Sequence, residues 1–178
     1  MDKVIKNFQN ITYGPAPEDS KEVNSWIKNL KNPNNHFING KFVKSSSSKK
    51  LNIINPSTNK KIATLSVASK KDVNAAVSAA KKAHVKWSKL SSFDRSKYLY
   101  ALARLIQKNS RFISVLETID NGKPIRETRD IDIPLVARHF YYHAGWAARN
   151  TNNSDGSIGV VGQIIPWTFP LLMLCLLY

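Results

Sequence analysis

The sequence predicts an α+β unit that leads into an incomplete α/β sheet. Short strands with turn signals occupy residues 36–67, and helical periodicity follows over residues 68–149. Residues 159–174 then read as a buried strand, a Pro-Trp turn and the start of a helix. A strand–loop–helix step of this kind opens a Rossmann-like, nucleotide-binding sheet. Because such a sheet needs several parallel strands to cover its faces, we expect the 178 residues to begin the sheet without completing it.

The composition is that of a folded protein from a reducing compartment. With 42% apolar residues and 10% aromatic residues, the chain is not of the disordered class. One cysteine excludes an internal disulfide framework and a CxxC metal site. The N-terminus has no apolar core of signal-peptide length, and the apolar stretch 169–178 is shorter than the roughly 20 residues that span a bilayer. We therefore expect a cytoplasmic protein with no membrane partner.

The net charge of +15 raises nucleic-acid binding as a rival function. The lysines fall mostly in pairs spread along the chain, at 49–50, 60–61, 70–71 and 81–82, without interleaved aromatic residues. Charges distributed in this way are typical of a solvated surface. We therefore expect no nucleic-acid partner and keep a basic nucleic-acid binder as the lesser alternative.

Residues 1–35 are predicted to form an N-terminal arm with one short helix. Asp19 and Glu22 have the spacing of a capping box in which Asp is the cap. Apolar residues follow at the i, i+3, i+4, i+7 spacing of one helix face; they are Val23, Trp26, Ile27 and Leu30. The Asn-Pro-Asn-Asn run at 32–35 is expected to end the helix.

Residues 36–67 are predicted to form a small antiparallel β unit. Asn39-Gly40 between apolar residues is a strong hairpin signal. Residues 51–55 and 62–67 read as two further strands, joined by a turn at Asn55-Pro56.

Residues 68–149 are predicted to form four helices, the helical part of a cofactor domain. The expected N-cap residues are Ser69 (in a capping box with Asp72), Ser91 and Ser110, and the fourth helix runs from about Pro134 to about Arg149. Asn121-Gly122 is expected to stop the third helix in a left-handed cap. The apolar stripe of the first helix holds Val73, Ala76, Val77, Ala80 and Trp87. The inward residues of the second and third helices are Leu99, Leu102, Leu105, Ile106, Ile113 and Leu116. One stripe of the fourth helix holds Val136, Phe140, His143 and Ala147.

Residues 150–178 are predicted to contain the first strand and the helix start of the nucleotide-binding sheet. A polar loop occupies 150–157, and the strand is expected at 158–165. Gly159 and Gly162 have GxxG spacing, which fits close packing on this strand and a phosphate loop about equally well.

Four motifs occur in the order found in the N-terminal part of NAD(P)-dependent aldehyde dehydrogenases, and the chain resembles that family. They are FINGK at 37–41, INPST at 54–58, DNGKP at 120–124 and GVVGQIIPWTFP at 159–170. Residues 13–18 and 131–146 resemble more particularly the sixteenth family of that superfamily. The resemblance extends from about residue 13 to residue 173 and covers the first part of a much longer family protein.

The resemblance implies oxidation of aldehydes to carboxylic acids with NAD or NADP. In the family a thiolate attacks the aldehyde, a hydride passes to the nicotinamide, and water activated by a carboxylate hydrolyses the thioester. The family nucleophile and general base belong to a later part of the protein, so we expect this chain to be inactive alone. The β unit at 36–67 resembles the part that joins subunits, which implies an oligomer with itself or with relatives. The alternative function is therefore a non-catalytic interaction module.

The resemblance also assigns site residues. Ile165, Pro166 and Trp167 fall where the family turn passes close to the cofactor. Thr168 falls where the family usually has Asn, whose side-chain amide helps to hold the oxyanion. The Thr hydroxyl is shorter, and loss of one oxyanion donor typically lowers turnover by about 10²–10³.

Other candidate residues have structural interpretations. Cys175 lies in an apolar run with no charged neighbour in sequence, which predicts a buried structural thiol. His139 and His143, spaced i, i+4, supply half of a metal site, so we expect no metal. We expect Asn121-Gly122 to act as a helix stop, and the side chains of Lys123 and Arg126 to be solvated.

Overall fold

The computed structural model describes residues 2–10, 18–30, 35–149 and 158–176. Its elements are α1 (Asp2–Gln9), α2 (Lys21–Lys28), β1 (Asn35–Ile38), β2 (Lys41–Lys44), β3 (Lys50–Asn55), β4 (Lys60–Ser66), α3 (Lys70–Trp87), α4 (Ser92–Lys108), α5 (Ser110–Asn121), α6 (Ile125–Glu127), the π-helical turn η1 (Thr128–Asp132), α7 (Ile133–Arg149) and α8 (Pro170–Leu176).

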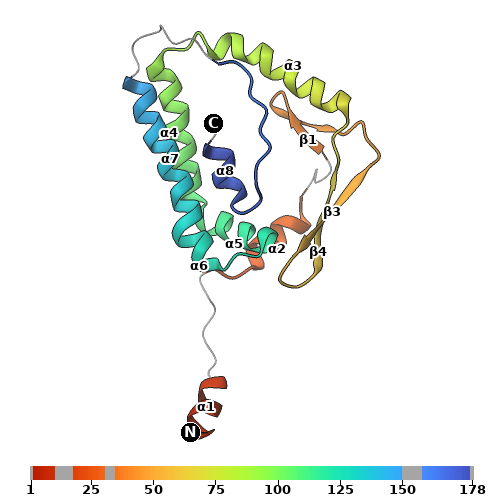
Figure 1. Ribbon diagram of the computed structural model, residues 1–178, viewed down its shortest axis with the longest axis vertical. Coiled ribbons are helices and arrows are strands. Elements are labelled where there is room, and N and C mark those ends of the chain that lie inside the picture. Colours follow the sequence, from red (N-terminus) through yellow and green to blue (C-terminus); the bar gives the residue numbers. More distant parts are fainter. Residues whose placement is uncertain (1, 11–17, 31–34, 150–157, 177–178) are drawn as a thin grey trace.

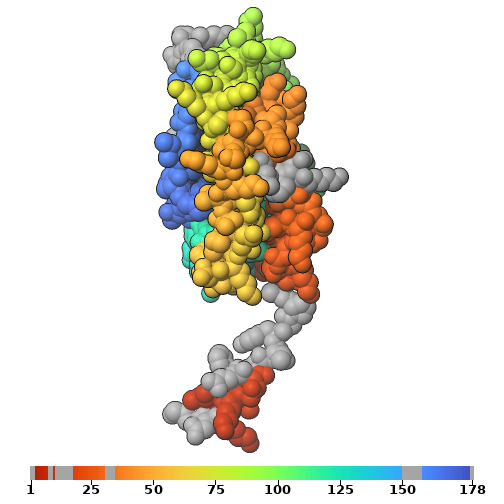
Figure 2. Space-filling model, turned by 90° about the vertical axis from the view of Figure 1, so that its right-hand side faces the viewer, coloured from red at the N-terminus to blue at the C-terminus, as the bar shows by residue number. Residues whose placement is uncertain are grey.

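The β unit consists of two antiparallel hairpins. β1 pairs with β2 through Asn39 and Gly40, whose positive φ values of 55° and 74° are those of the predicted Asn-Gly turn. β3 pairs with β4, and an irregularity lies between Ile53 and Ile54. Figure 2 shows this β unit (orange to gold) along one face, with α3 above it and α2 beside its lower part. The prediction of four short antiparallel strands is confirmed.

The four predicted helices correspond to α3, α4, α5 and α7, whereas the short α6 and η1 between α5 and α7 were not predicted. Ser69 and Asp72 form the expected capping box, and Ser91 Oγ accepts a hydrogen bond from the Asp94 N–H. Asp72 also accepts hydrogen bonds from the Ser46 N–H and the Ser45 hydroxyl, so the buried carboxylate ties α3 to the end of the β1–β2 hairpin. The hydrogen bond from the Ser69 N–H, followed by that from the Ser46 N–H, holds the pKa of Asp72 well below its usual range, while burial opposes this shift.

Two cap predictions are wrong by one residue. α2 begins after Ser20, so Asp19 lies too early to cap it and instead accepts a hydrogen bond from the Lys21 N–H at 2.8 Å. α5 already includes Ser110, and its N-cap is Asn109. Leu105 is also not inward, since 56% of its surface is exposed.

The helical core forms where α4, α7 and α8 meet. α4 and α7 pack side by side along their lengths, and α8 packs against α7 (Figure 1). Val136, Leu172 and Cys175 are buried there, with Ile106 and Phe140 among the half-buried residues around them. α3 is peripheral, and the Val73 and Val77 side chains of its apolar stripe are exposed.

The strand predicted at 158–165 is not formed. The segment is extended but belongs to no sheet, because the described strands pair only within the β1–β2 and β3–β4 hairpins. Ile158 and Ile164 are almost fully exposed. The helix start after it is present as α8, so the mixed α and β fold with an incomplete sheet is confirmed, while the strand itself lacks a neighbour to pair with.

Within the described part of the chain, no helix combines the length and the apolarity that crossing a membrane requires.

Candidate functional site

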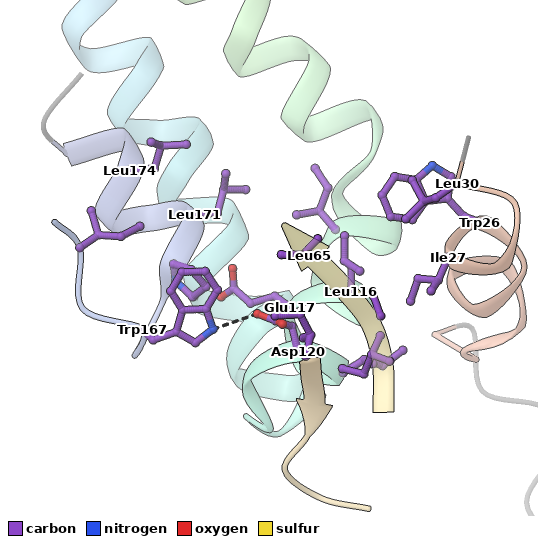
Figure 3. A pocket seen from close by; sticks show the side chains of 17 residues that line it. Trp26, Ile27, Leu30, Leu65, Leu116, Glu117, Asp120, Trp167, Leu171 and Leu174 are labelled. Carbon is purple, nitrogen blue, oxygen red and sulfur yellow. Dashed lines mark hydrogen bonds between the residues drawn. The ribbon is translucent and has the colours of Figure 1, made fainter. Parts of the chain in front are cut away.

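The candidate site lies where the turn at residues 165–168 meets the C-terminal end of α5. Gly122 ends α5 in the predicted left-handed conformation, with φ of 82°. On the last turn of α5, Asp120 Oδ2 accepts a hydrogen bond from Trp167 Nε1 at 2.9 Å (Figure 3). The indole is thereby held against α5, although 59% of the Trp167 surface remains exposed.

Asn121 holds the backbone of the same turn. Its Nδ2 donates to the carbonyl oxygens of Trp167, at 3.0 Å, and of Thr168, at 2.8 Å. Its Oδ1 accepts from the Lys123 N–H at 2.9 Å. Both polar atoms of the amide group, Nδ2 and Oδ1, are therefore held by backbone partners.

Lys123 is half-buried and belongs to a charged cluster whose acids are buried, so the prediction of a solvated side chain is wrong. Its Nζ lies 2.5 Å from Asp132 Oδ2 and 4.6 Å from the centroid of the Phe169 ring. Asp132 is buried at the end of η1. The reversal at Gly122 directs Lys123 back toward η1 and the turn, a direction that its position in the sequence does not reveal.

Glu117 is the third member of this cluster, and it was not among the site residues predicted from the sequence. It is buried on α5, and burial followed by the neighbouring Asp132 raises its pKa from 4.5 to about 7. The Leu171 N–H and the Lys123 charge act in the opposite direction. Its Oε1 forms no hydrogen bond to any described residue. An acid between Ile113, Leu116 and Ile119 on an apolar helix face is the sequence signal that could have identified it.

An apolar cavity of about 430 Å³ lies beside the turn, between α5, α2, β3–β4 and α8. Ile165 and Trp167 form part of its wall, whereas Pro166 and Thr168 do not line it. The acidic side chains in the wall are Glu117 and Asp120. Burial raises the pKa of Asp120, and the hydrogen bond from the Trp167 indole opposes that shift.

Thr168 is exposed, as an accessible oxyanion donor would need to be. Its carbonyl oxygen is bound by Asn121, while its hydroxyl has no hydrogen bond to the described residues. The hydroxyl is free to donate to an added group, but it offers one donor where an Asn amide offers two.

Comparison with known proteins identifies the family. The model of the "Aldehyde dehydrogenase family" matches residues 42–177.

The chain belongs to the aldehyde dehydrogenase family.

Curated relatives agree with this assignment. The chain is 43% identical over 151 residues to "Aldehyde dehydrogenase family 2 member B4, mitochondrial" of Arabidopsis thaliana, which covers 77% of this chain and 28% of the relative. It is 40% identical over 154 residues to "Aldehyde dehydrogenase" of Alternaria alternata, over 79% of this chain and 31% of the relative. The chain therefore spans about 30% of the length of these relatives.

Solved structures of family members have the same fold over this part. The P. syringae AldA indole-3-acetaldehyde dehydrogenase in complex with NAD+ and IAA matches with a TM-score of 0.75 and 28% identity, over 85% of this chain and 33% of that chain. A double mutant of Staphylococcus aureus betaine aldehyde dehydrogenase in complex with NAD+ matches with a TM-score of 0.71 and 27% identity, over 86% of this chain and 33% of that chain.

Cys175 is a buried structural thiol in this aldehyde dehydrogenase chain. It lies in the α7–α8 core, and its Sγ donates to the Val136 carbonyl oxygen at 3.5 Å. Burial raises the pKa of the thiol to about 11. Because the thiolate is the nucleophilic form, Cys175 is unsuited to attack an aldehyde.

The remaining candidates lie away from the turn. The rings of His139 and His143 stack with centroids 6.1 Å apart, and His143 Nδ1 contacts the His139 carbonyl oxygen at 2.8 Å. In the described ranges no three His, Cys, Asp or Glu residues are grouped so as to hold a metal ion. A Cβ atom at Gly159 or Gly162 would meet nothing within 4 Å, so close packing, one of the two interpretations of this GxxG spacing, is not observed among the described residues, although Gly159 has a φ of 101°.

Proposed function

We propose that this chain forms the cofactor-facing N-terminal part of an NAD(P)-dependent aldehyde dehydrogenase that oxidises aldehydes to carboxylic acids. The observation that supports this most is the fixed turn at Trp167 and Thr168, bound by α5 at the indole and at two carbonyl oxygens. Membership of the sixteenth family and a cytoplasmic location remain predictions from the sequence.

In this proposal Ile165, Pro166 and Trp167 contact the dinucleotide, which supplies a hydride acceptor when bound. The residues fit such a role because the indole is anchored through Nε1 while more than half of the Trp167 surface stays open. Pro166 is exposed beside it, so the turn presents a rigid apolar surface to a flat ring. Thr168 would donate a hydrogen bond to the developing oxyanion less effectively than Asn.

A second candidate function is subunit contact through the unit at 36–67. Phe37 and Phe42 stack edge to face across the β1–β2 hairpin with ring centroids 5.2 Å apart, yet 66% and 58% of their surfaces are exposed. Paired exposed aromatic side chains of this kind favour an interface with another copy of the chain or with a relative. We propose 1–35 as an arm, 36–67 as the contact unit, and 68–149 with 150–178 as the start of the cofactor domain.

Aldehyde oxidation by the 178-residue chain alone tests the first proposal. We expect no aldehyde-dependent NADH formation, because the one cysteine of these residues is buried with a raised thiol pKa. Activity that survives purification and disappears in Cys175→Ser would contradict this expectation.

Sedimentation of the same preparation tests the second proposal. Dimers or larger species that are lost in a Phe37→Ser/Phe42→Ser variant support subunit contact through the unit at 36–67, and a strictly monomeric chain rejects it.

A further inference from the structure

We infer that residues 120–123 are a positioning element that sets the conformation of the 166–168 turn, with Asn121 as its main positioning residue. In the sequence, the only structural role that Asn121-Gly122 indicates is that of a helix stop. The inference rests on the proposed function for the importance of the turn, but its geometric content stands on contacts within the chain.

A series of contacts between two short segments supports this inference. Asp120 binds the Trp167 indole, Asn121 binds the carbonyl oxygens of Trp167 and Thr168, and Lys123 covers the Phe169 ring. Side chains of one segment thus contact three consecutive residues of the other, 46 or more positions later in the chain. A helix stop would need none of these contacts.

The orientation of the Asn121 side-chain amide also supports the inference. Because the Lys123 N–H must meet an acceptor, the amide oxygen faces Lys123 and the nitrogen faces the two carbonyl oxygens. In a planar trans peptide the C=O and N–H groups point in opposite directions. Directing the Trp167 carbonyl toward Asn121 therefore turns the Thr168 N–H away from α5, on the exposed side of the turn.

The positioning element at 120–123 is itself anchored to the β3–β4 turn. A Cβ atom at Gly122 would lie 2.6 Å from Pro56 Cγ, so the β3–β4 turn is packed directly against the left-handed residue of the element. The motifs at 54–58, 120–124 and 159–170, far apart in the sequence, meet at this point. The fixed turn is consequently linked to the β unit through Gly122, and not only to α5.

Indole N–H exchange in the full 178-residue chain tests this inference without cofactor. The four tryptophans give four indole signals in a ¹⁵N spectrum, and Trp167→Phe assigns the relevant one. Asn121→Asp places carboxylate oxygens against two carbonyl oxygens, so we expect the Trp167 signal to shift and its exchange to accelerate about fivefold to tenfold. The signals of Trp26, Trp87 and Trp146 should not change.

Asn109→Asp is the matched control, because Asn109 Nδ2 also donates to a backbone carbonyl, that of Leu105, but lies away from the turn. It should leave the Trp167 signal unchanged. Asn121→Ala, which removes the donor without adding charge, serves if Asn121→Asp fails to fold and should give the same selective change. An unaltered Trp167 signal in a folded Asn121 variant would overturn the inference. Because no dinucleotide is present, failure of the proposed function would leave this result intact.

Discussion

Lys123→Met is expected to lower the free energy of unfolding by about 3 kcal/mol, since removing one partner of a buried ion pair leaves an uncompensated charge. Methionine keeps most of the apolar stem, so lost packing contributes little. The Asp132 side chain is only 3% exposed, and Glu117 lies beside it. Both acids then lose the cation that neutralises the cluster. Urea denaturation at pH 7, monitored by circular dichroism, measures the change.

The chain contains a matched exposed pair as a control. Lys97 Nζ lies 2.9 Å from Asp94 Oδ1 and 4.6 Å from the Phe93 ring centroid, the same combination of partners as for Lys123. The Lys97 and Asp94 side chains are 60% and 46% exposed, so water screens their interaction. We expect Lys97→Met to lower the free energy of unfolding by no more than about 1 kcal/mol. Equal decreases in the two variants would show that the Lys123 cluster is not buried.

Glu117 is expected to make stability fall as the pH rises from about 4.5 to about 7. Its folded-state pKa, about 7, lies above the ordinary value of 4.5. Below pH 4.5 the carboxyl group is protonated in both states; between the two values the unfolded chain alone releases its proton, so rising pH favours unfolding. Above pH 7 both states are ionised and the loss is complete. At about 1.4 kcal/mol for each pKa unit, the difference between 4.5 and about 7 corresponds to a loss of roughly 3–4 kcal/mol.

Glu117→Gln isolates this contribution, because Gln keeps the shape and cannot ionise. We expect the variant to be more stable than the natural chain at pH 8 and to lose the difference near pH 5, as measured by thermal unfolding across the range. Glu127→Gln, at an exposed position on α6, is the control and should leave the pH dependence unchanged. A Glu117→Gln variant whose stability follows the same pH curve as the natural chain would show that Glu117 is ionised when folded.

The local elements could be predicted because their signals are local. The Asn39-Gly40 turn, the Ser69–Asp72 capping box and the Gly122 cap each depend on residues within one turn of backbone, and all three are present. The strand at 158–165 could not be predicted in the same way, since a strand exists only with a hydrogen-bonded neighbour. Its apolar pattern identifies burial in a sheet, but not whether the neighbour is present.

The candidate site was predicted only in part for a related reason. The turn residues 165–168 were identified by resemblance, whereas the side chains that hold them come from a segment interpreted as a helix stop. Asn121 and Lys123 acquire their roles from the direction of the chain after Gly122 and from the π-helical turn η1, which brings Asp132 inward. Such contacts between distant segments leave no periodic or spacing signal.

A chimeric enzyme tests the central claim most directly. Residues 42–176 of this chain replace the matching part of the Arabidopsis relative, and NADH formation is followed with an aldehyde and NAD+. We predict that the chimera carrying Thr168→Asn forms NADH, and that the version with Thr168 turns over about 10²–10³ more slowly because one oxyanion donor is weakened. A folded chimera that forms no NADH even with Thr168→Asn would contradict the proposal that this chain supplies the cofactor-facing part of an aldehyde dehydrogenase.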